Sequence, residues 1–257
     1  MKIFVCIKQV PDTETKVKIA ADGKSLDAAG VKWVMNPYDE YAVEEAIKIR
    51  DQNAGSQIFA ITVGPKKRAI EVVRTALAMG ADEGLVVDAP ENIDASVTAE
   101  LLAKAIAAEG PAQLILSGKL AIDDNASAVG QMLAENLGIG HTSVVSKLGW
   151  NPEAVTVERD TEGGAKEVVR VKLPAVIAAN KGLNMPRYAS LQGIMKAKKK
   201  TVKEIDGATL GVKLEAKTPV LSFEMPPEKP AVKMLSGDAA TQAKTLTEAL
   251  RNEAKVI

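Results

Sequence analysis

The residues best suited to chemistry lie in one stretch of the sequence, SGKLAIDDNASAVGQM at residues 117–132. A strand pattern ends at Ser117 and Gly118, and a loop leads from there into a helix predicted to begin at about Ala126. The first N–H groups of a helix lack backbone partners and lie at the positive end of the helix dipole, so they suit a phosphate group. Small side chains in the predicted first turn leave room for it: Ala126, Ser127 and Ala128.

Polar side chains in the same loop leave two interpretations open. Asp123, Asp124 and Asn125 precede the predicted helix, and such side chains commonly cap helices. Asp123 also suits a ribose hydroxyl, whereas two carboxylates beside a phosphate are unfavourable unless they cap the helix or point away. The chemistry alone supports a nucleotide phosphate site and a capped structural turn about equally.

The sequence contains no recognisable catalytic constellation. It lacks the GxxxxGK[ST] and GxGxxG patterns of common phosphate-binding loops. Cys6 and His141 are the only cysteine and histidine, which excludes a typical zinc site, and His141 has no Ser/Asp arrangement beside it. A nucleotide-type fold without an acid–base pair favours a carrier or scaffold over an enzyme.

Two further segments fall where predicted strands end. In MNPYDEYAVEEA, Pro37 restricts Asn36 to extended backbone, and Asp39 is suited to cap the following helix. In TVGP, Gly64 after Val63 permits close approach of a ligand to the backbone. Taken alone, each segment is more simply interpreted as a turn.

The elements that must position these segments alternate along the chain. Nearly continuous apolar runs predict buried parallel strands at 2–7, 57–63, 84–87 and 113–117. Helices are predicted between and after them, at 39–52, 66–79, 94–108 and 126–137. This alternation predicts a doubly wound, mainly parallel α/β fold of the Rossmann-like, adenine-nucleotide-binding kind, in which ligands bind at the carboxyl ends of the strands.

The pattern changes after about residue 145. The segments AVTVERD and KEVVRVKLPAVIAAN flank TEGG and predict an antiparallel hairpin at the sheet edge. We therefore expect a nucleotide-binding domain at residues 1–200 and an extended C-terminal arm at 201–257. An arm with little core of its own needs a partner surface or stays partly disordered.

Composition narrows the possible partners and compartments. Lys plus Arg and Asp plus Glu number 33 each, and aromatic residues make up 3%, which argues against nucleic acid. The single cysteine fits a reducing compartment. No apolar window reaches the length of a membrane span, and the first apolar run is too short for a signal peptide. We expect no membrane insertion and a bacterial cytoplasmic location.

Residues 157–200, VERDTEGGAKEVVRVKLPAVIAANKGLNMPRYASLQGIMKAKKK, closely resemble the signature of the electron transfer flavoprotein β subunit. MNPYDEYAVEEA, RTALAMGAD and GKLAIDDNASAVGQM match further, and the resemblance weakens only after about residue 210. It implies a heterodimer whose α subunit holds most of a redox-active FAD, a structural AMP in this chain, and a C-terminal arm that contacts α. It also implies electron transfer from flavin dehydrogenases, such as acyl-CoA dehydrogenases, to a quinone reductase, with the chemistry on FAD.

The resemblance assigns the AMP contacts residue by residue. They are Cys6 through its backbone, Asn36, Pro37, Tyr38, Asp39, Val63, Gly118, Lys119, Leu120, Ala121, Ile122, Asp123, Asp124, Asn125, Ala126, Ser127, Ala128 and Val129. Asp124 and Gln131 resemble the AMP-binding type, whereas the start CIKQVPDT resembles members that bifurcate electrons with a second FAD in place of AMP. Thr13 stands where AMP-type members often have a tyrosine near the flavin.

The resemblance also gives RYASLQGIMKAKKK a role within a recognition loop at 184–200. Leu191 matches the family's anchor for the dehydrogenase, and Ile194 and Met195 support it. The charges of Lys196, Lys198, Lys199 and Lys200 would attract acidic partner surfaces. Alternatively, Leu191 packs in the chain's own core. A stand-alone adenine-nucleotide sensor of the universal-stress type is a further alternative, which predicts a homodimer without flavin.

Overall fold

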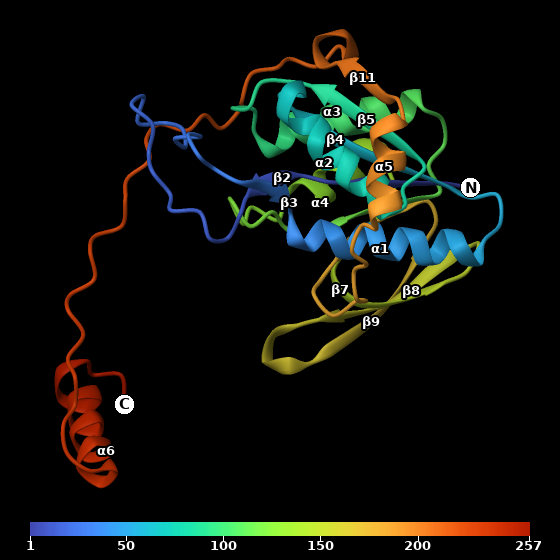
Figure 1. Cartoon of the computed structure of the whole chain (residues 1–257). Helices are drawn as coiled ribbons and strands as arrows, with labels where there is room; N and C mark the ends of the chain where they lie inside the picture. Colours follow the sequence, from blue (N-terminus) through green and yellow to red (C-terminus); the bar gives the residue numbers. More distant parts are fainter. The chain divides into compact units, whose positions relative to one another are not determined.

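The computed structural model describes residues 1–257, which form two compact units, Met1–Ser222 and Phe223–Ile257. The first unit is built on a nine-stranded sheet with the order β11-β5-β4-β1-β6-β10-β7-β8-β9 (Figure 1). All pairs from β11 to β7 are parallel, whereas β7, β8 and β9 pair antiparallel. The predicted doubly wound, mainly parallel α/β class with an antiparallel edge hairpin is therefore confirmed.

The parallel strands carry apolar side chains on both faces. Along β1, Ile3 and Val5 pack into one hydrophobic cluster, whereas Phe4 and Cys6 pack into the other. A strand covered on both sides has no polar alternation, which is why these segments read as continuous apolar runs. The parallel strands are β1 (Lys2–Cys6), β4 (Gln57–Gly64), β5 (Glu83–Asp88), β6 (Leu114–Gly118), β10 (Ala175–Ala179) and β11 (Val202–Asp206).

Helices cover both faces of the sheet. Side chains of α1 (Pro37–Gln52), α2 (Lys66–Met79) and α5 (Leu191–Lys199) belong to the first cluster. Those of α3 (Ala95–Ala108) and α4 (Val129–Leu137) belong to the second. The three layers place the carboxyl ends of β1, β4 and β6 at one edge, beside the starts of α1, α2 and α4.

The antiparallel part differs from prediction in one strand. The predicted hairpin is present as β8 (Ala154–Asp160) and β9 (Lys166–Lys172), joined through the 3₁₀ turn Glu162–Gly164. However, residues 175–179 do not continue the hairpin, because Pro174 lacks the N–H that a ladder needs. They form β10, which lies between β6 and the unpredicted strand β7 (Gly140–Trp150).

The first unit extends beyond the predicted boundary at residue 200. β11 pairs in parallel with β5, and Val202 is buried against the sheet. A 3₁₀ turn, Gly207–Leu210, follows, and the N–H of Thr218 donates to Asp94 at 2.8 Å. Residues 201–222 therefore belong to the α/β unit, because the short, charged strand at 202–206 completes a sheet edge.

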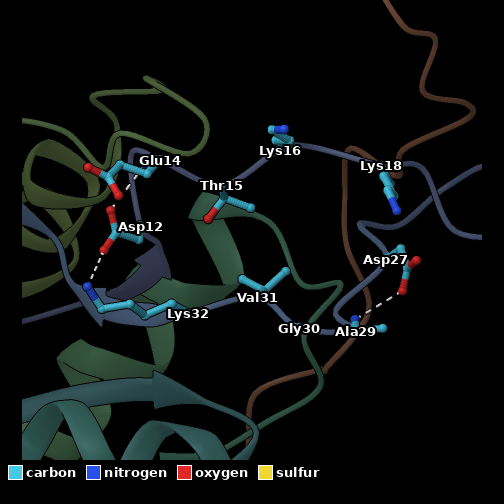
Figure 2. A pocket seen from close by; sticks show the side chains of 10 residues that line it. All are labelled: Asp12, Glu14, Thr15, Lys16, Lys18, Asp27, Ala29, Gly30, Val31 and Lys32. Atoms are coloured by element: carbon cyan, nitrogen blue, oxygen red, sulfur yellow. Dashed lines mark hydrogen bonds and ion pairs between the residues drawn. The ribbon is translucent and has the colours of Figure 1, made fainter.

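A small two-stranded sheet, β2 (Gln9–Pro11) with β3 (Trp33–Met35), closes a long loop after β1. An ion pair of 2.6 Å between Asp12 and Lys32 joins the two ends of the loop. Figure 2 shows the pocket within it, whose wall carries both acidic and basic side chains. None of the predicted site residues lies in this pocket.

The second unit contains one α-helix, α6 (Ala239–Glu248), continued by the π-helical turn Ala249–Glu253. Asp238 caps α6 by accepting from the N–H of Thr241 at 2.9 Å. No side chain of the unit is buried, as expected of an arm without a core. Its apolar side chains are exposed: Phe223, Met225, Val232, Met234, Leu246, Val256 and Ile257.

No helix in either unit has the length and apolar character needed to cross a bilayer.

Gly84 on β5 provides a test of the packing of α2 on the sheet. A Cβ atom added at Gly84 would lie 2.4 Å from Cγ1 of Val73 and 3.2 Å from Cδ1 of Leu77. We predict that Gly84→Ala lowers the free energy of unfolding by about 1–3 kcal/mol, because extra volume in a dense core forces strain. Urea denaturation of the full chain measures this loss.

Val73→Ala provides the matched rescue, because it removes the methyl groups that the new Cβ meets. The double variant should be more stable than the sum of the two single losses predicts. Gly149→Ala on β7 is the control, since its added Cβ meets only an ordinary 3.5 Å contact with the Thr156 carbonyl. Strictly additive losses would contradict the packing described here.

Candidate functional site

The start of α1 joins the carboxyl ends of β1 and β6. The buried carboxylate of Asp39 accepts from the N–H of Lys8 at 2.7 Å and from the N–H of Gly118 at 2.9 Å. The side-chain amide of Asn36 donates to the carbonyl of Leu120 at 2.8 Å and accepts from the N–H of Ile122 at 3.2 Å. The segments at 36–39 and 118–122, distant in sequence, are therefore held together.

Gly118 is required by this close approach. A Cβ atom at Gly118 would lie 2.4 Å from Oδ1 of Asp39 and 2.6 Å from Cβ of Tyr38. The next residue, Lys119, donates its N–H to the carbonyl of Ala179 at 2.9 Å, which ties the loop to β10. The Lys119 ammonium lies 5.0 Å from the centre of the Tyr38 ring, within the range of a cation–π interaction.

The predicted start of the fourth helix at about Ala126 is wrong. The helix α4 begins at Val129, because Asn125 and Ser127 have φ of +52° and +49°, which no helix accommodates. The Ser127 hydroxyl donates to the carbonyl of Lys119 at 2.8 Å and holds the loop in this shape. Ala126, Ser127 and Ala128 thus form a loop before the helix instead of its first turn.

Asp123 and Asp124 do not cap α4 either. The Lys8 ammonium lies 2.8 Å from Asp123 and 3.1 Å from Asp124, and Asp124 also accepts from the N–H of Ala126 at 3.0 Å. Burial alone lowers the pKa of Lys8, but the two carboxylates outweigh it and raise the pKa. The single ammonium offsets one of the two negative charges, so it reduces the expected repulsion of a phosphate without removing it.

Lys8 was missed by the sequence analysis of the site. The signal was present, because Lys8 interrupts an otherwise apolar segment directly after β1. A charged residue at the carboxyl end of a buried strand lies at the edge where ligands bind.

Cys6 and Val63 lie at the same edge as the loop. Cys6 ends β1, between Ile61 of β4 and Ser117 of β6. Burial, with the charge of Asp39 as the smaller cause, raises the pKa of the Cys6 thiol far above its ordinary value, so the thiol stays protonated and unreactive. Val63 is half-buried near the end of β4 and precedes Gly64, whose φ is +151°.

The start of α4 has the features of an anion-binding site. Its N-cap Ala128 has no side-chain acceptor, so it leaves the first N–H groups of the helix without a side-chain partner. The buried hydroxyl of Ser117 lacks a hydrogen-bond partner, and a Cβ at Gly130 would lie only 3.4 Å from it. Free donors and a small residue in the first turn fit a phosphate group. No group of His, Cys, Asp and Glu side chains is arranged to hold a metal ion.

The predicted docking residues lie on a helix instead of a loop. Leu191, Ile194 and Met195 in α5 expose 76%, 40% and 58% of their surface. The alternative that Leu191 packs in the chain's own core is therefore wrong. Among the lysines, Lys196, Lys198 and Lys199 are exposed.

The rest of α5 is fixed to α2 and to the start of β5. A Cβ at Gly193 would lie 2.4 Å from the carbonyl oxygen of Ala78, and Ala197 is buried. Arg74 of α2 donates to the carbonyl of Ala197 at 2.8 Å. Lys200 does not extend outward with the other lysines, because its ammonium donates to the carbonyls of Ala81 and Asp82.

The protonation of Asp39 gives a testable pH dependence. Burial raises the pKa of Asp39 to about 7, against the effect of the donors from Lys8, Asn36 and Gly118. The unfolded chain loses this proton near pH 4, so between pH 4 and 7 the folded chain binds more protons. The free energy of unfolding should fall as pH rises through this range.

We predict that the full chain loses about 2–3 kcal/mol of stability from pH 5 to pH 8 through this group. Asp39→Asn, which mimics the neutral acid, should lack this part of the loss, and urea denaturation across the pH range measures the difference. Parallel curves for the two proteins would show that Asp39 does not titrate in this window.

Comparisons with known proteins show the family of the chain. The family model described as "Electron transfer flavoprotein domain" matches residues 24–210. The chain is 39% identical over 257 residues to an electron transfer flavoprotein subunit beta of Bradyrhizobium diazoefficiens, and 41% identical over 262 residues to that of Bacillus subtilis. Each match covers the whole of both chains. The human protein of the same name is 40% identical over 235 residues, which cover 90% of this chain and 91% of its own. These matches show that the chain belongs to the electron transfer flavoprotein β-subunit family.

Proposed function

We propose that this chain is the β subunit of a heterodimeric electron transfer flavoprotein. In this role it carries no catalytic residue of its own and passes electrons from flavin dehydrogenases, such as acyl-CoA dehydrogenases, to a quinone reductase. The FAD, held mostly by the α subunit, supplies the redox chemistry when bound. The observation that carries the proposal is the family match over nearly the whole chain. A reducing compartment such as the bacterial cytoplasm remains our prediction, because Cys6 is the only cysteine.

The edge formed by Cys6, residues 36–39, Val63 and residues 118–129 is the proposed AMP site. The N–H groups at the start of α4 have no side-chain partner and suit the phosphate, and Gly130 adds no side chain to the first turn of the helix. The ion pairs of Lys8 with Asp123 and Asp124 reduce the repulsion between the two carboxylates and the anion. We infer that the site holds a single structural AMP, because the free N–H groups at the start of α4 suit one phosphate group.

The second unit, Phe223–Ile257, is the proposed contact with the α subunit. It exposes a run of apolar side chains and buries none. A segment of this composition needs a partner surface to become ordered, and the α subunit is the partner that we propose for it.

Nucleotide content tests the AMP assignment. The purified αβ complex should release one FAD and one AMP on denaturation, counted by chromatography against protein concentration. Two FAD per heterodimer would identify a bifurcating protein. A stable homodimer without flavin would instead support the nucleotide-sensor alternative.

Ala128→Asp tests where the phosphate binds. An N-cap aspartate satisfies the first N–H groups of a helix and adds negative charge, so this variant should keep α4 and lose AMP. We expect at least about a tenfold drop in bound AMP, because 1.4 kcal/mol of repulsion suffices. FAD content should stay unchanged.

Ala128→Asn is the matched control for Ala128→Asp, since it caps the helix without the charge. It should retain more AMP than Ala128→Asp. Equal AMP content in both variants and in the natural chain would exclude the start of α4 as the phosphate-binding site.

Leu191→Ala tests docking of the dehydrogenase. Burial of one leucine contributes about 1.5–3 kcal/mol, so the KM of the dehydrogenase for this carrier should rise about 10- to 100-fold. Stability and FAD content should be unchanged, because Leu191 is 76% exposed. Steady-state reduction of the αβ complex measures the effect.

Val168→Ala on β9 is the control for docking, because Val168 is equally apolar and 68% exposed. Its KM should match that of the natural protein. An unchanged KM for Leu191→Ala would remove α5 from the docking surface.

A further inference from the structure

The segment between β10 and α5 has no helix or strand of its own. Residues 180–190 follow Ala179 and end at Ser190, which caps α5 by accepting from the N–H of Gly193 at 3.0 Å. Along this segment Met185 and Tyr188 are 90% and 99% exposed. A backbone without a ladder, and with such exposed side chains, must be held by specific contacts if it is to have one conformation.

Buried carboxylates of α1 supply these contacts. Glu44, whose side chain is only 8% exposed, receives two bonds from the Arg187 guanidinium, at 2.7 and 2.9 Å. The backbone N–H of Arg187 also donates to Glu44, at 3.2 Å. Because one carboxylate binds both the guanidinium group and the backbone N–H of Arg187, it fixes the position and the direction of the chain at this residue.

A second contact, from the neighbouring glutamate, lies three residues earlier in the segment. The side-chain amide of Asn184 donates to Oε2 of Glu45 and to the carbonyl of Tyr41, both at 2.9 Å. Glu45 is 3% exposed and also pairs with Lys48 at 3.0 Å. Charged groups are buried this deeply only where they are paired. The charge of Glu44 is paired with Arg187 of the segment, whereas Glu45 is paired with Lys48 and holds the segment through the neutral amide of Asn184.

We propose that Glu44, through Arg187, is the positioning residue of the docking helix. Contacts with α2 and with the residues just before β5 fix α5 from Gly193 onward, but Leu191 lies before Gly193, at the N-terminal end of the helix and directly after residues 184–190. The Glu44–Arg187 pair therefore sets where Leu191 is presented. This inference rests on the proposed docking role of Leu191.

The same helix joins the docking segment to the proposed nucleotide site. Asn36 and Asp39 at the start of α1 hold the loop at 118–122, and Glu44 and Glu45 follow on the same helix. A rigid helix fixes both sets of contacts relative to each other. The two functional surfaces are consequently built on one element.

The test uses the assembled αβ complex with a flavin dehydrogenase as electron donor. Arg187→Ala and Glu44→Gln should each raise the KM for the carrier about tenfold, because the partner must then order the segment itself. The kcat should stay within about twofold, since the flavin is untouched. Arg187→Lys keeps the positive charge but loses the two parallel hydrogen bonds of the guanidinium group. Its KM should therefore lie between those of Arg187→Ala and the natural protein.

Hydrogen exchange of the complex provides a readout that does not need the dehydrogenase. Amides of residues 183–194 should exchange faster by about tenfold in the variants, while those of β1 and β6 stay protected. The double variant Glu44→Gln/Arg187→Gln removes both charges, so it leaves no unpaired buried charge that could unfold the protein. Faster exchange in this variant therefore reports the loss of the pair and not general unfolding. Arg159→Ala, which breaks the 3.3 Å pair with Glu167 on the β8–β9 hairpin, is the control.

The outcomes separate this inference from the proposed function. If Leu191→Ala raises the KM and the Glu44 and Arg187 variants do not, the positioning role is overturned. If Leu191→Ala has no effect, docking through Leu191 fails, and the exchange data then decide whether the pair orders the segment. Unchanged exchange at 183–194 in every variant would overturn the inference regardless of docking.

Discussion

The buried carboxylate of Asp39 holds together the sheet edge at which we propose the nucleotide site. Two backbone N–H groups, from the ends of β1 and β6, have no ladder partner once the strands stop, and a single carboxylate satisfies both. Leaving one buried N–H without an acceptor costs at least as much free energy as a typical hydrogen bond contributes to stability. The start of α1 is thereby fixed over the central strands, and Gly118 must be a glycine because the helix lies so close.

Much of the sheet could be predicted because its strands are short, apolar and separated by well-marked helices. The prediction of 66–79 for α2 is correct at both ends, and β1, β4, β5 and β6 end within one residue of their predicted limits. What could not be predicted is order in space. Pro174 in the run KLPAVIAAN marks where the hairpin strand ends, but nothing in AVIAAN places the next strand between β6 and β7, because its apolar residues suit any interior strand of the sheet. The short charged strand β11 carries even less signal, since a sheet edge tolerates polar side chains.

The site shows the same division between local and distant information. The strand pattern placed residues 36–39 and the start of the loop after residue 117 each at a strand end, and the family resemblance assigned residues 36–39 and 118–129 to one site. The start of α4 was placed too early, since the left-handed backbone at Asn125 and Ser127 depends on a contact with Lys119. The pairing of Glu44 with Arg187 joins residues 143 positions apart. A sequence shows that such charges exist, but only the fold decides which of them meet.

The insertion of β10 between β6 and β7 has a consequence for synthesis of the chain. As the polypeptide leaves the ribosome, β1, β4, β5 and β6 emerge first, yet the neighbour of β6 is made only at residues 175–179. Until then the edge of β6 is open, and its apolar faces lack the cover that the finished core provides. Pairing of segments so distant in sequence is slow, and open strand edges favour aggregation. The growing chain therefore has an exposed sheet edge at mid-translation, where a molecular chaperone is most useful.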